Sequence, residues 1–268
     1  MAFVEKRKNS LIYMQSTQIP FPHAFSTRFG GVSTGDLSSL NFGVSRGDDP
    51  ENVRENYRRF CEIFGTDENS TCVTNQSHSN NVLNVTGKDI HQCLEDDVLQ
   101  DVDGLVTGVR GLPICCFTAD CVPALLADPE GHAVAAVHCG WKGSVADILG
   151  TAVSEMCRLG AKAENICCAL GPAIGKCCFE TDRDVPEAIS SYLSGETDGL
   201  WTVCSSGKYL VDLRAANRRR LMQLGLKETN IDVSDECTFC SHEKYWSHRY
   251  TLKHGQMRGN LGSMIMLE

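Results

Sequence analysis

The sequence lacks any uninterrupted apolar run of about 18 residues, the length that a membrane-spanning helix requires. Lys6, Arg7 and Lys8 lie near the N-terminus, but no apolar stretch of signal-peptide length follows them. We therefore expect a cytoplasmic protein that has no membrane partner.

Basic residues are in the minority, since 25 Lys and Arg side chains stand against 34 Asp and Glu, which gives a net charge of −9. Contacts with the phosphates of nucleic acids require a basic surface. This charge balance therefore argues against a nucleic acid as partner.

The chain also lacks internal repeats, low-complexity segments and linkers rich in Pro, Gly or Ser. Its 268 residues are enough for one large domain with a substantial core. We expect a single domain over residues 1–268, in which residues 1–20 are a candidate N-terminal extension.

Paired H-x-H motifs, from which multicopper oxidases build their copper clusters, are absent too. No two of the eight histidines are separated by a single residue, so we do not expect copper chemistry. The histidines are His23, His78, His91, His132, His138, His242, His248 and His254.

Cysteine, by contrast, is abundant, with 15 residues that include the doublets Cys115–Cys116, Cys167–Cys168 and Cys177–Cys178. An odd number of cysteines without a secretory signal does not indicate a disulfide framework. Neighbouring cysteines on a strand face opposite ways, so we interpret the doublets as small buried hydrophobic residues in a reducing compartment.

Strand-like and helix-like segments are interspersed without the regular rhythm of a doubly wound sheet. Helices are expected where apolar residues recur every three or four positions, with Asp48 or Asp49 capping the first and Gly160 ending the second. The pattern predicts an α/β protein with mixed β-sheets flanked by helices. The expected helices span 52–64, 145–159, 187–193 and 213–224, and the expected strands span 112–117, 122–127, 133–137, 166–170 and 263–267.

One expected hairpin carries a candidate site. The apolar runs 122–127 and 133–137 flank Asp128-Pro129-Glu130-Gly131, which is a turn signal. If Asp128 pairs with Gly131, Cys121 lies directly opposite His138, with Cβ atoms about 4.5–5.5 Å apart. That separation suits two ligands of one metal ion, a thiolate and its base, or a core pairing without chemistry.

His78, in the polar segment 75–82, is a third candidate ligand, although a histidine in such a segment is usually a surface residue. Catalytic zinc sites commonly have three protein ligands and leave the fourth position to water or substrate. Two imidazoles and a thiolate suit zinc better than magnesium or calcium. We therefore take His78, Cys121 and His138 as the candidate metal ligands.

Other motifs carry weaker signals. Arg28 lies in the glycine-rich segment 27–33, where a guanidinium and exposed amides suit an anion. Helix N-terminal amides in the turn after His138 also suit an anion. Cys237 and Cys240 form a lone C-x-x-C motif, and because no second pair at matching spacing is evident, we interpret both as structural thiols.

Seven motifs occur in order from about Phe25 to the C-terminus. They are Thr27-Arg28-x-Gly30-Gly31-x-Ser33, Leu40-Asn41-x-Gly43, Gln76-x-His78, Asp101-x-Asp103-Gly104, Thr118-Ala119-Asp120-Cys121-x-Pro123, His138-x-Gly140-Trp141-Lys142-Gly143 and Gly171-Pro172-x-Ile174-Gly175. Together they resemble the YfiH-like laccase-domain family, whose members are also labelled polyphenol oxidase or multicopper oxidase.

Members of that family are understood as purine nucleoside enzymes that phosphorolyse adenosine, inosine, guanosine and methylthioadenosine and that deaminate adenosine. The resemblance implies purine nucleosides and inorganic phosphate as partners, and a fold similar to the catalytic domain of cytotoxic necrotizing factor. It also implies one zinc ion per chain, held at the positions that match the family's ligands, His78, Cys121 and His138.

The same three residues are then the expected catalytic residues. Zinc deaminases of the H-x-E type use a Glu as proton shuttle, and because this chain lacks that motif, Asp120 is the candidate in its place. The candidates for contacts with phosphate, ribose or base are Arg28, Asn41, Lys142 and Arg249.

Two positions depart from the family pattern. Tyr250 stands where the C-terminal motif usually has a second Arg, so Arg249 is the cation that remains there. Lys176 stands where family members often have Pro.

The residues leave other functions open. A metal-free cysteine hydrolase would use Cys121 as nucleophile and His138 as its base, with His78 assisting. A non-catalytic scaffold would keep the pocket for ligand sensing, and a copper-dependent phenol oxidase is the least favoured function. Metal content separates the zinc enzyme from the cysteine hydrolase.

Overall fold

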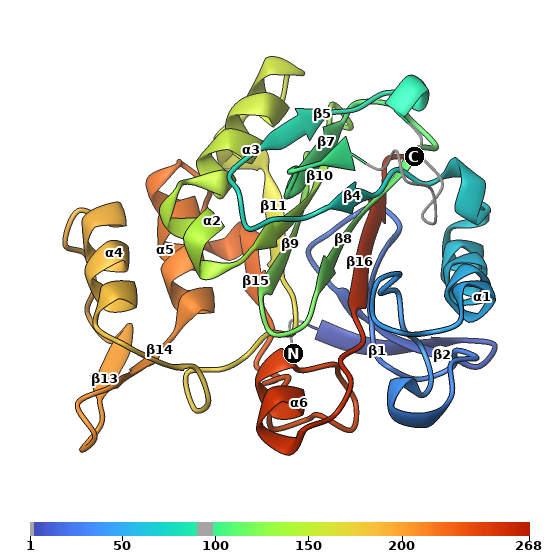
Figure 1. Ribbon diagram of the computed structural model, residues 1–268. Coiled ribbons are helices and arrows are strands. Elements are labelled where there is room, and N and C mark those ends of the chain that lie inside the picture. The colour runs from blue at the N-terminus through green and yellow to red at the C-terminus, as the bar shows by residue number, and fades with distance from the viewer. Residues whose placement is uncertain (1–2, 90–98) are drawn as a thin grey trace.

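Two β-sheets and their flanking helices make up most of the computed structural model, which describes residues 3–89 and 99–268 (Figure 1). One sheet has five strands in the order β1-β2-β3-β16-β8, and the other has six in the order β15-β11-β9-β10-β7-β5. In the six-stranded sheet, β11–β15 and β5–β7 pair in parallel and the other pairs are antiparallel. The predicted mixed α/β architecture is confirmed.

The element bounds agree with most of the segments expected from the sequence. The strands are β1 Phe3–Lys8, β2 Leu11–Ser16, β3 His23–Ser26, β4 Thr74–Asn75, β5 Val82–Asn84, β6 Leu99–Gln100, β7 Gly104–Thr107, β8 Pro113–Thr118, β9 Val122–Ala127, β10 Val134–Cys139, β11 Cys167–Leu170, β12 Glu180–Thr181, β13 Trp201–Val203, β14 Tyr209–Val211, β15 Ile231–Val233 and β16 Leu261–Met266. The α-helices are α1 Pro50–Cys61, α2 Trp141–Val145, α3 Ile148–Arg158, α4 Asp184–Tyr192, α5 Leu213–Gln223 and α6 His248–His254.

Alternate residues of β10 belong to two different cores. Ala135 and Val137 pack in a core that includes residues of α3, α4 and α5. Helices α3 and α5 cover one side of the six-stranded sheet, and α4 lies outside them (Figure 1). Val134 and Ala136 pack against residues of β16 and β8 in the core between the sheets. Because side chains alternate along a strand, His138 points to the same face as Ala136, between the sheets.

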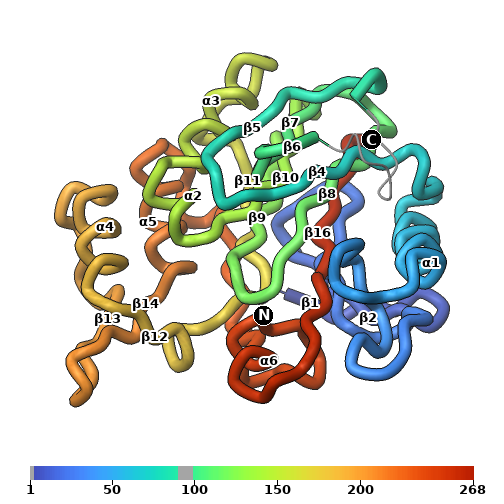
Figure 2. The backbone as a smooth tube through the Cα atoms, in the orientation of Figure 1, coloured from blue at the N-terminus to red at the C-terminus, as the bar shows by residue number. Residues whose placement is uncertain are grey.

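The five-stranded sheet contains both the first and the last strands of the chain, as the blue and red segments show (Figure 2). Helix α1 packs on the outer side of this sheet through Val53, Tyr57 and Phe60. Of the candidate N-terminal extension, residues 3–16 form β1 and β2 of this sheet, while Met1 and Ala2 lie outside the described residues.

The hairpin of β9 and β10 forms, but the predicted register was wrong by two residues. His138 faces Pro123, because strand pairing begins only where the backbone N–H of Asp128 donates to the carbonyl of Ala133 at 3.0 Å. The Asp128–Gly131 turn lies within this longer loop. A shift of two residues keeps every side chain on its face of the sheet, so Cys121 lies diagonal to His138 rather than opposite it.

The helix expected over 145–159 is instead divided into α2 and α3. Asp147, between them, has a positive φ of 67° and caps α3 with its carboxylate, which accepts from the N–H of Gly150 at 3.2 Å. The same carboxylate pairs with Arg220 at 2.6 Å. These contacts hold the chain in a turn where the apolar spacing alone predicts a continuous helix.

Two of the three cysteine doublets are buried on strands as predicted, Cys115–Cys116 on β8 and Cys167–Cys168 on β11. The third prediction was wrong: Cys177 and Cys178 lie in a turn between β11 and β12, and Cys177 is exposed. Every cysteine within the described residues is free, and Cys93 lies outside them.

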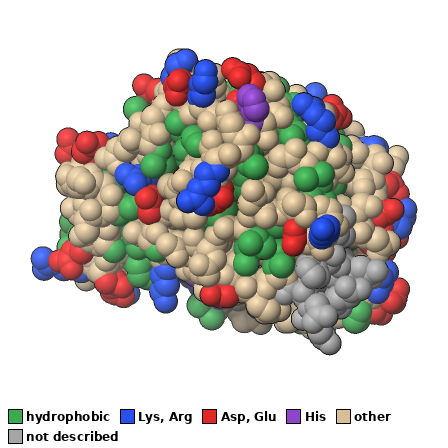
Figure 3. Space-filling view, turned by 90° about the horizontal axis from the view of Figure 1, so that it is seen from above, with side chains coloured by type: hydrophobic (Ala, Val, Ile, Leu, Met, Phe, Trp, Pro, Cys, Tyr) green, Lys and Arg blue, Asp and Glu red, His purple; other side chains and the backbone are tan. Residues whose placement is uncertain are grey.

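The described helices include none that is both long and apolar enough to cross a membrane. On the face seen from above, Lys and Arg side chains lie among Asp and Glu side chains rather than in one basic patch (Figure 3).

Candidate metal centre

Three side chains from separate elements bring their donor atoms together. The donor atoms of His78, Cys121 and His138 all lie within 4.8 Å of one another. His78 comes from the loop between β4 and β5, Cys121 from the turn between β8 and β9, and His138 from β10. His138 is buried, Cys121 is half-buried and His78 is exposed, so the group is open to solvent on one side.

A buried carboxylate orients His138. The Oδ1 atom of Asp103 lies 2.6 Å from Nδ1 of His138, which leaves the Nε2 atom for the centre of the group. Burial raises the pKa of Asp103, but the hydrogen bond from His138 and those from backbone N–H groups outweigh it and hold the pKa well below its usual range. Metal-binding histidines commonly have such a carboxylate partner.

Asp103 also shapes the loop that carries His78. Its two oxygens accept hydrogen bonds from the backbone N–H groups of Ser77, His78 and Ser79 at 2.9–3.0 Å. One carboxylate therefore positions two of the three candidate ligands, which explains the Asp-x-Asp-Gly motif that the sequence analysis left without a role.

Gln76 anchors the other end of the same loop. Its side-chain amide accepts from the N–H of Phe117 and donates to the carbonyl of Phe117, both at 2.7 Å. Phe117 lies on β8, the strand that leads to Cys121. The side-chain amide thus bonds the backbone of β8 as a neighbouring strand would. These two hydrogen bonds set the position of the His78 loop relative to Cys121.

Gly140 makes room for the three donor atoms. A Cβ atom there would lie 2.4 Å from Nδ1 of His78 and 3.4 Å from the sulfur of Cys121. Any other residue would therefore displace His78. This steric requirement explains the glycine that follows His138 by two positions.

The charges of the group favour a thiolate. Burial raises the pKa of the Cys121 thiol, but the charges and hydrogen bonds of His138 and His78 outweigh it and bring the pKa to about 6. Burial lowers the pKa of His138, whereas the Cys121 thiolate and Asp103 raise it, to about 9. A thiolate with two imidazoles on one face is the donor set of a divalent transition metal.

The three residues line a cavity of about 480 Å³. Aromatic and apolar side chains form one wall, among them Phe42, Tyr57 and Phe117. Cavities of this size commonly bind small molecules. The candidate metal ligands therefore face a space that suits a substrate.

Two arginines that the sequence analysis missed line the same cavity. Burial lowers the pKa of Arg258, and the nearby charge of Arg46 lowers it further. Neither guanidinium forms a salt bridge within the described part of the chain. The buried Nε of Arg46 and the Oγ1 of Thr118, both in the cavity wall, have no hydrogen-bond partner there. Two close cations with unused donors suit an anion.

Glycines beside both arginines are the signal that sequence reasoning could have used. A Cβ atom on Gly43 would lie 2.4 Å from Cγ of Arg46, and one on Gly259 would lie 2.4 Å from the ring of Trp246. Glycine is therefore needed where each arginine segment packs closely. Asn41 joins the two segments, because its Oδ1 accepts from the N–H of Gly43 at 2.8 Å and of Asn260 at 3.0 Å.

The predicted cationic contacts lie elsewhere. Arg28 donates to the carbonyls of Ser38 at 2.8 Å and His242 at 3.0 Å and stacks on Trp246, outside the described cavity wall. Arg249 donates to the carbonyl of Glu180 at 3.0 Å. Lys142 is exposed over the ring of Trp141. Their contacts with a substrate stay predictions, as does that of the buried Asn41.

Asp120 lies beside Cys121 but its carboxylate is occupied. One oxygen accepts from the hydroxyl of Thr238 and the other from the N–H of Arg249, each at 2.6 Å. Asp120 thereby ties the β8–β9 turn to the start of α6, which lie close together (Figure 1). Its role as a proton shuttle stays a prediction.

Comparison with known proteins identifies the family. The family described as "Multi-copper polyphenol oxidoreductase laccase" matches residues 22–268. Purine nucleoside phosphorylase YlmD of Geobacillus stearothermophilus is 33% identical over 243 residues, which cover 90% of this chain and 86% of that protein. Adenosine deaminase RL5, from an unknown prokaryotic organism, is 36% identical over 231 residues, which cover 84% of this chain and 87% of that protein.

The crystal structure of the Geobacillus stearothermophilus YlmD superposes with a TM-score of 0.92 at 30% identity and covers 100% of this chain and 99% of that one. The chain therefore belongs to the multi-copper polyphenol oxidoreductase laccase family.

Proposed function

We propose that the protein is a zinc-dependent purine nucleoside phosphorylase that also deaminates adenosine. The observation that carries the proposal is that the candidate metal ligands and the two unpaired arginines, Arg46 and Arg258, line one cavity. Relatives named purine nucleoside phosphorylase and adenosine deaminase support both activities. Its location in the cytoplasm stays a prediction.

Zinc suits the donor set better than copper does. Two histidines and a cysteine also occur in blue-copper centres, but those add a weak axial ligand such as Met and transfer electrons. None of the described residues that line the cavity is a methionine, and the group opens on a space of about 480 Å³. Three protein ligands with an open position are typical of catalytic zinc. When bound, zinc polarises substrate oxygens and lowers the pKa of water.

The cation pair supplies what phosphorolysis requires. In that reaction a phosphate oxygen forms a bond to C1′ of the ribose while the bond from C1′ to the purine nitrogen breaks, and the base leaves with a proton. Arg46 and Arg258 bind the phosphate, because neither forms a salt bridge among residues 3–89 and 99–268 and the Nε of Arg46 has no hydrogen-bond partner among them. The aromatic wall formed by Phe42, Tyr57 and Phe117 accommodates a flat purine.

Product analysis of the purified enzyme tests the proposal. With adenosine and phosphate, we expect adenine and ribose 1-phosphate, and without phosphate we expect inosine and ammonia. Formation of neither pair of products, despite nucleoside binding, would favour a non-catalytic scaffold. Oxidation of a phenol dependent on added copper would favour the oxidase instead.

Arg258→Gln should separate the two reactions. Loss of one charge-assisted hydrogen bond costs about 1.5–3 kcal/mol, so KM for phosphate should rise roughly 10–100-fold while the deamination rate changes little. Initial rates at varied phosphate concentration measure this effect. Lys142→Gln is the matched control, because Lys142 is exposed outside the described cavity wall. If Lys142→Gln raises the KM for phosphate and Arg258→Gln does not, the phosphate site is at the helix entrance.

A metal-free cysteine hydrolase is the second candidate function, and one observation favours it. The pKa of Cys121 at about 6 and that of His138 at about 9 are those of a thiolate and its protonated partner. Enzyme freed of zinc with a chelator decides between the functions. Full activity that iodoacetamide then abolishes supports the hydrolase, and loss of activity that added zinc restores supports the zinc enzyme.

A further inference from the structure

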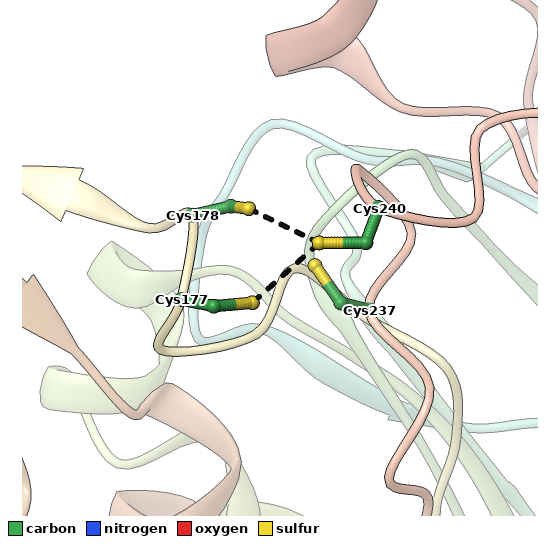
Figure 4. A group of neighbouring side chains, drawn as sticks. All are labelled: Cys177, Cys178, Cys237 and Cys240. Atoms are coloured by element: carbon green, nitrogen blue, oxygen red, sulfur yellow. Dashed lines mark hydrogen bonds between the residues drawn. The ribbon is translucent and has the colours of Figure 1, made fainter.

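A second group of cysteines lies outside the candidate active site. Cys177 and Cys178 come from the turn between β11 and β12, and Cys237 and Cys240 come from the segment after β15. All four sulfur atoms lie within 4.8 Å of one another. The four side chains point toward a common centre from the two segments (Figure 4). The sequence analysis interpreted Cys177 and Cys178 as small buried hydrophobic residues, and it interpreted Cys237 and Cys240 as structural thiols because no second pair at matching spacing was evident.

The spacing of the sulfurs is that of a metal site. The sulfur of Cys240 lies 3.7 Å from that of Cys177 and 3.4 Å from that of Cys178. Zinc–sulfur bonds of about 2.3 Å in a regular tetrahedron separate the sulfurs by roughly 3.8 Å. A disulfide requires about 2.05 Å between one pair only, whereas Cys240 lies at nearly equal distances from two sulfurs.

A single ion suits the group better than an iron–sulfur cluster, because the irons of a cluster spread their cysteine ligands further apart. The sulfurs here are all mutual neighbours within 4.8 Å, with no space for several irons between them. Four thiolates in this arrangement are typical of structural zinc.

The backbone around the group is built to receive thiolates. The N–H of Gly175 donates to the sulfur of Cys237 at 3.2 Å, as in the outer shells of metal sites. A Cβ atom on Gly175 would lie 3.2 Å from the sulfur of Cys177 and 3.2 Å from Nη2 of Arg214, so the segments meet closely at this glycine. The buried Arg214 guanidinium also offsets negative charge beside the group.

The two segments are already joined at one point and lead to the candidate active site. The N–H of Thr238 donates to the carbonyl of Ala173 at 3.1 Å. The hydroxyl of Thr238 and the N–H of Ile174 both donate to Asp120, at 2.6 and 2.9 Å. Asp120 precedes Cys121, so an ion that joins the segments would also hold the turn that presents Cys121.

We propose that Cys177, Cys178, Cys237 and Cys240 bind one structural zinc ion. By joining the two segments that hydrogen-bond Asp120, this ion stabilises the β8–β9 turn. Binding replaces four S–H bonds by four Zn–S bonds and releases four protons, with no change of oxidation state. This site is separate from the one formed by His78, Cys121 and His138, and it does not depend on the proposed function.

Metal analysis of purified variants tests the proposal. The wild type should contain about two zinc ions per chain, and Cys240→Ser and Cys121→Ala should each contain about one. Cys157→Ser, which removes an exposed cysteine outside both groups, is the control and should retain both ions. Cys240→Ser should also lower Tm by roughly 5–10 °C, as expected for a site filled at about 100 times its Kd.

Wild-type protein provides a second measurement if Cys240→Ser does not fold. Cobalt that replaces zinc should show the intense sulfur-to-metal absorption and the visible bands of a tetrahedral tetrathiolate site, and Cys177→His should keep the ion in a Cys3His set. Equal zinc in wild type and Cys240→Ser would overturn the proposal. Iron in place of zinc would also overturn the proposal. So would disulfide bonds among these four cysteines in metal-free protein, which dithiothreitol would reduce to free thiols.

Discussion

Cys121→Ala is expected to lower kcat/KM for both phosphorolysis and deamination by about 1000-fold or more, which corresponds to roughly 4 kcal/mol of transition-state stabilisation. The thiolate is the one sulfur donor of the candidate metal group, so its loss leaves two imidazoles, which hold zinc poorly. The overall fold should survive, because Cys121 is only half-buried and lies in a turn. Steady-state rates, zinc content and Tm measure the three effects.

Cys157→Ser is the matched control for this variant, since it removes an exposed thiol that does not line the described cavity and should leave rates and zinc content unchanged. Wild-type rates in a Cys121→Ala protein that holds no zinc at His78 and His138 would show that the reaction does not use this site. Cys121→Ala also removes the nucleophile that a cysteine hydrolase would use. The chelation experiment on the wild type therefore separates the loss of zinc from the loss of a nucleophile.

Asp103→Asn is expected to weaken zinc binding by about 10–100-fold and to lower the free energy of unfolding by roughly 2–4 kcal/mol. The wild-type carboxylate accepts from His138 at 2.6 Å and from the backbone N–H groups of Ser77, His78 and Ser79. An amide has one oxygen for these donors and turns its own N–H groups toward the rest. Zinc titration with a competing chelator and urea unfolding measure the two losses.

The stabilisation by Asp103 should depend on pH with a definite sign. Its pKa is depressed in the folded protein, so the carboxylate stabilises the fold at every pH above about 3.9, the pKa of an unfolded aspartate. The difference between wild type and Asp103→Asn should therefore shrink in acid. It should also shrink as pH rises from about 6.5 through about 9, because Asp103 helps to raise the pKa of His138 and His138 loses its proton there.

Asp101→Asn is the control, because Asp101 is exposed and, among the described residues, its side chain bonds Ser77 and Asn81 alone. Asp101→Asn should lower the free energy of unfolding by less than about 1 kcal/mol and leave zinc affinity unchanged. If both variants behave alike, the effect belongs to the loop and not to the orientation of His138.

The register of the β9–β10 hairpin shows how a wrong local prediction can still bring the right side chains together. The turn signal at Asp128–Gly131 is real, but the buried pairing of Asp128 with Ala133 extends the loop. The period of a strand is two residues, so an error of two leaves Cys121 and His138 on one face. An error of one would have placed them in different cores.

Charge was harder to assign from the sequence than metal ligation. Arg28 has the glycine-rich context of an anion site, yet its guanidinium is used by backbone carbonyls and by Trp246. Arg46 and Arg258 belong to no motif that the sequence analysis singled out, and yet both line the cavity and neither forms a salt bridge with a described residue. A guanidinium binds carbonyls and phosphates with the same donors, so only the surroundings decide which of them it meets.

By itself the sequence determined the chemistry available to this protein: His78, Cys121 and His138 as candidate metal donors, glycines at close approaches, and a mixed α/β fold. Donor types and strand and turn patterns are local properties of the chain. Only the tertiary structure decided which distant residues act together. It joined Asp103 to both histidines, Arg46 to Arg258, and Cys177 and Cys178 to Cys237 and Cys240. Packing of the two sheets and their loops sets these distances, and separation along the chain does not encode them.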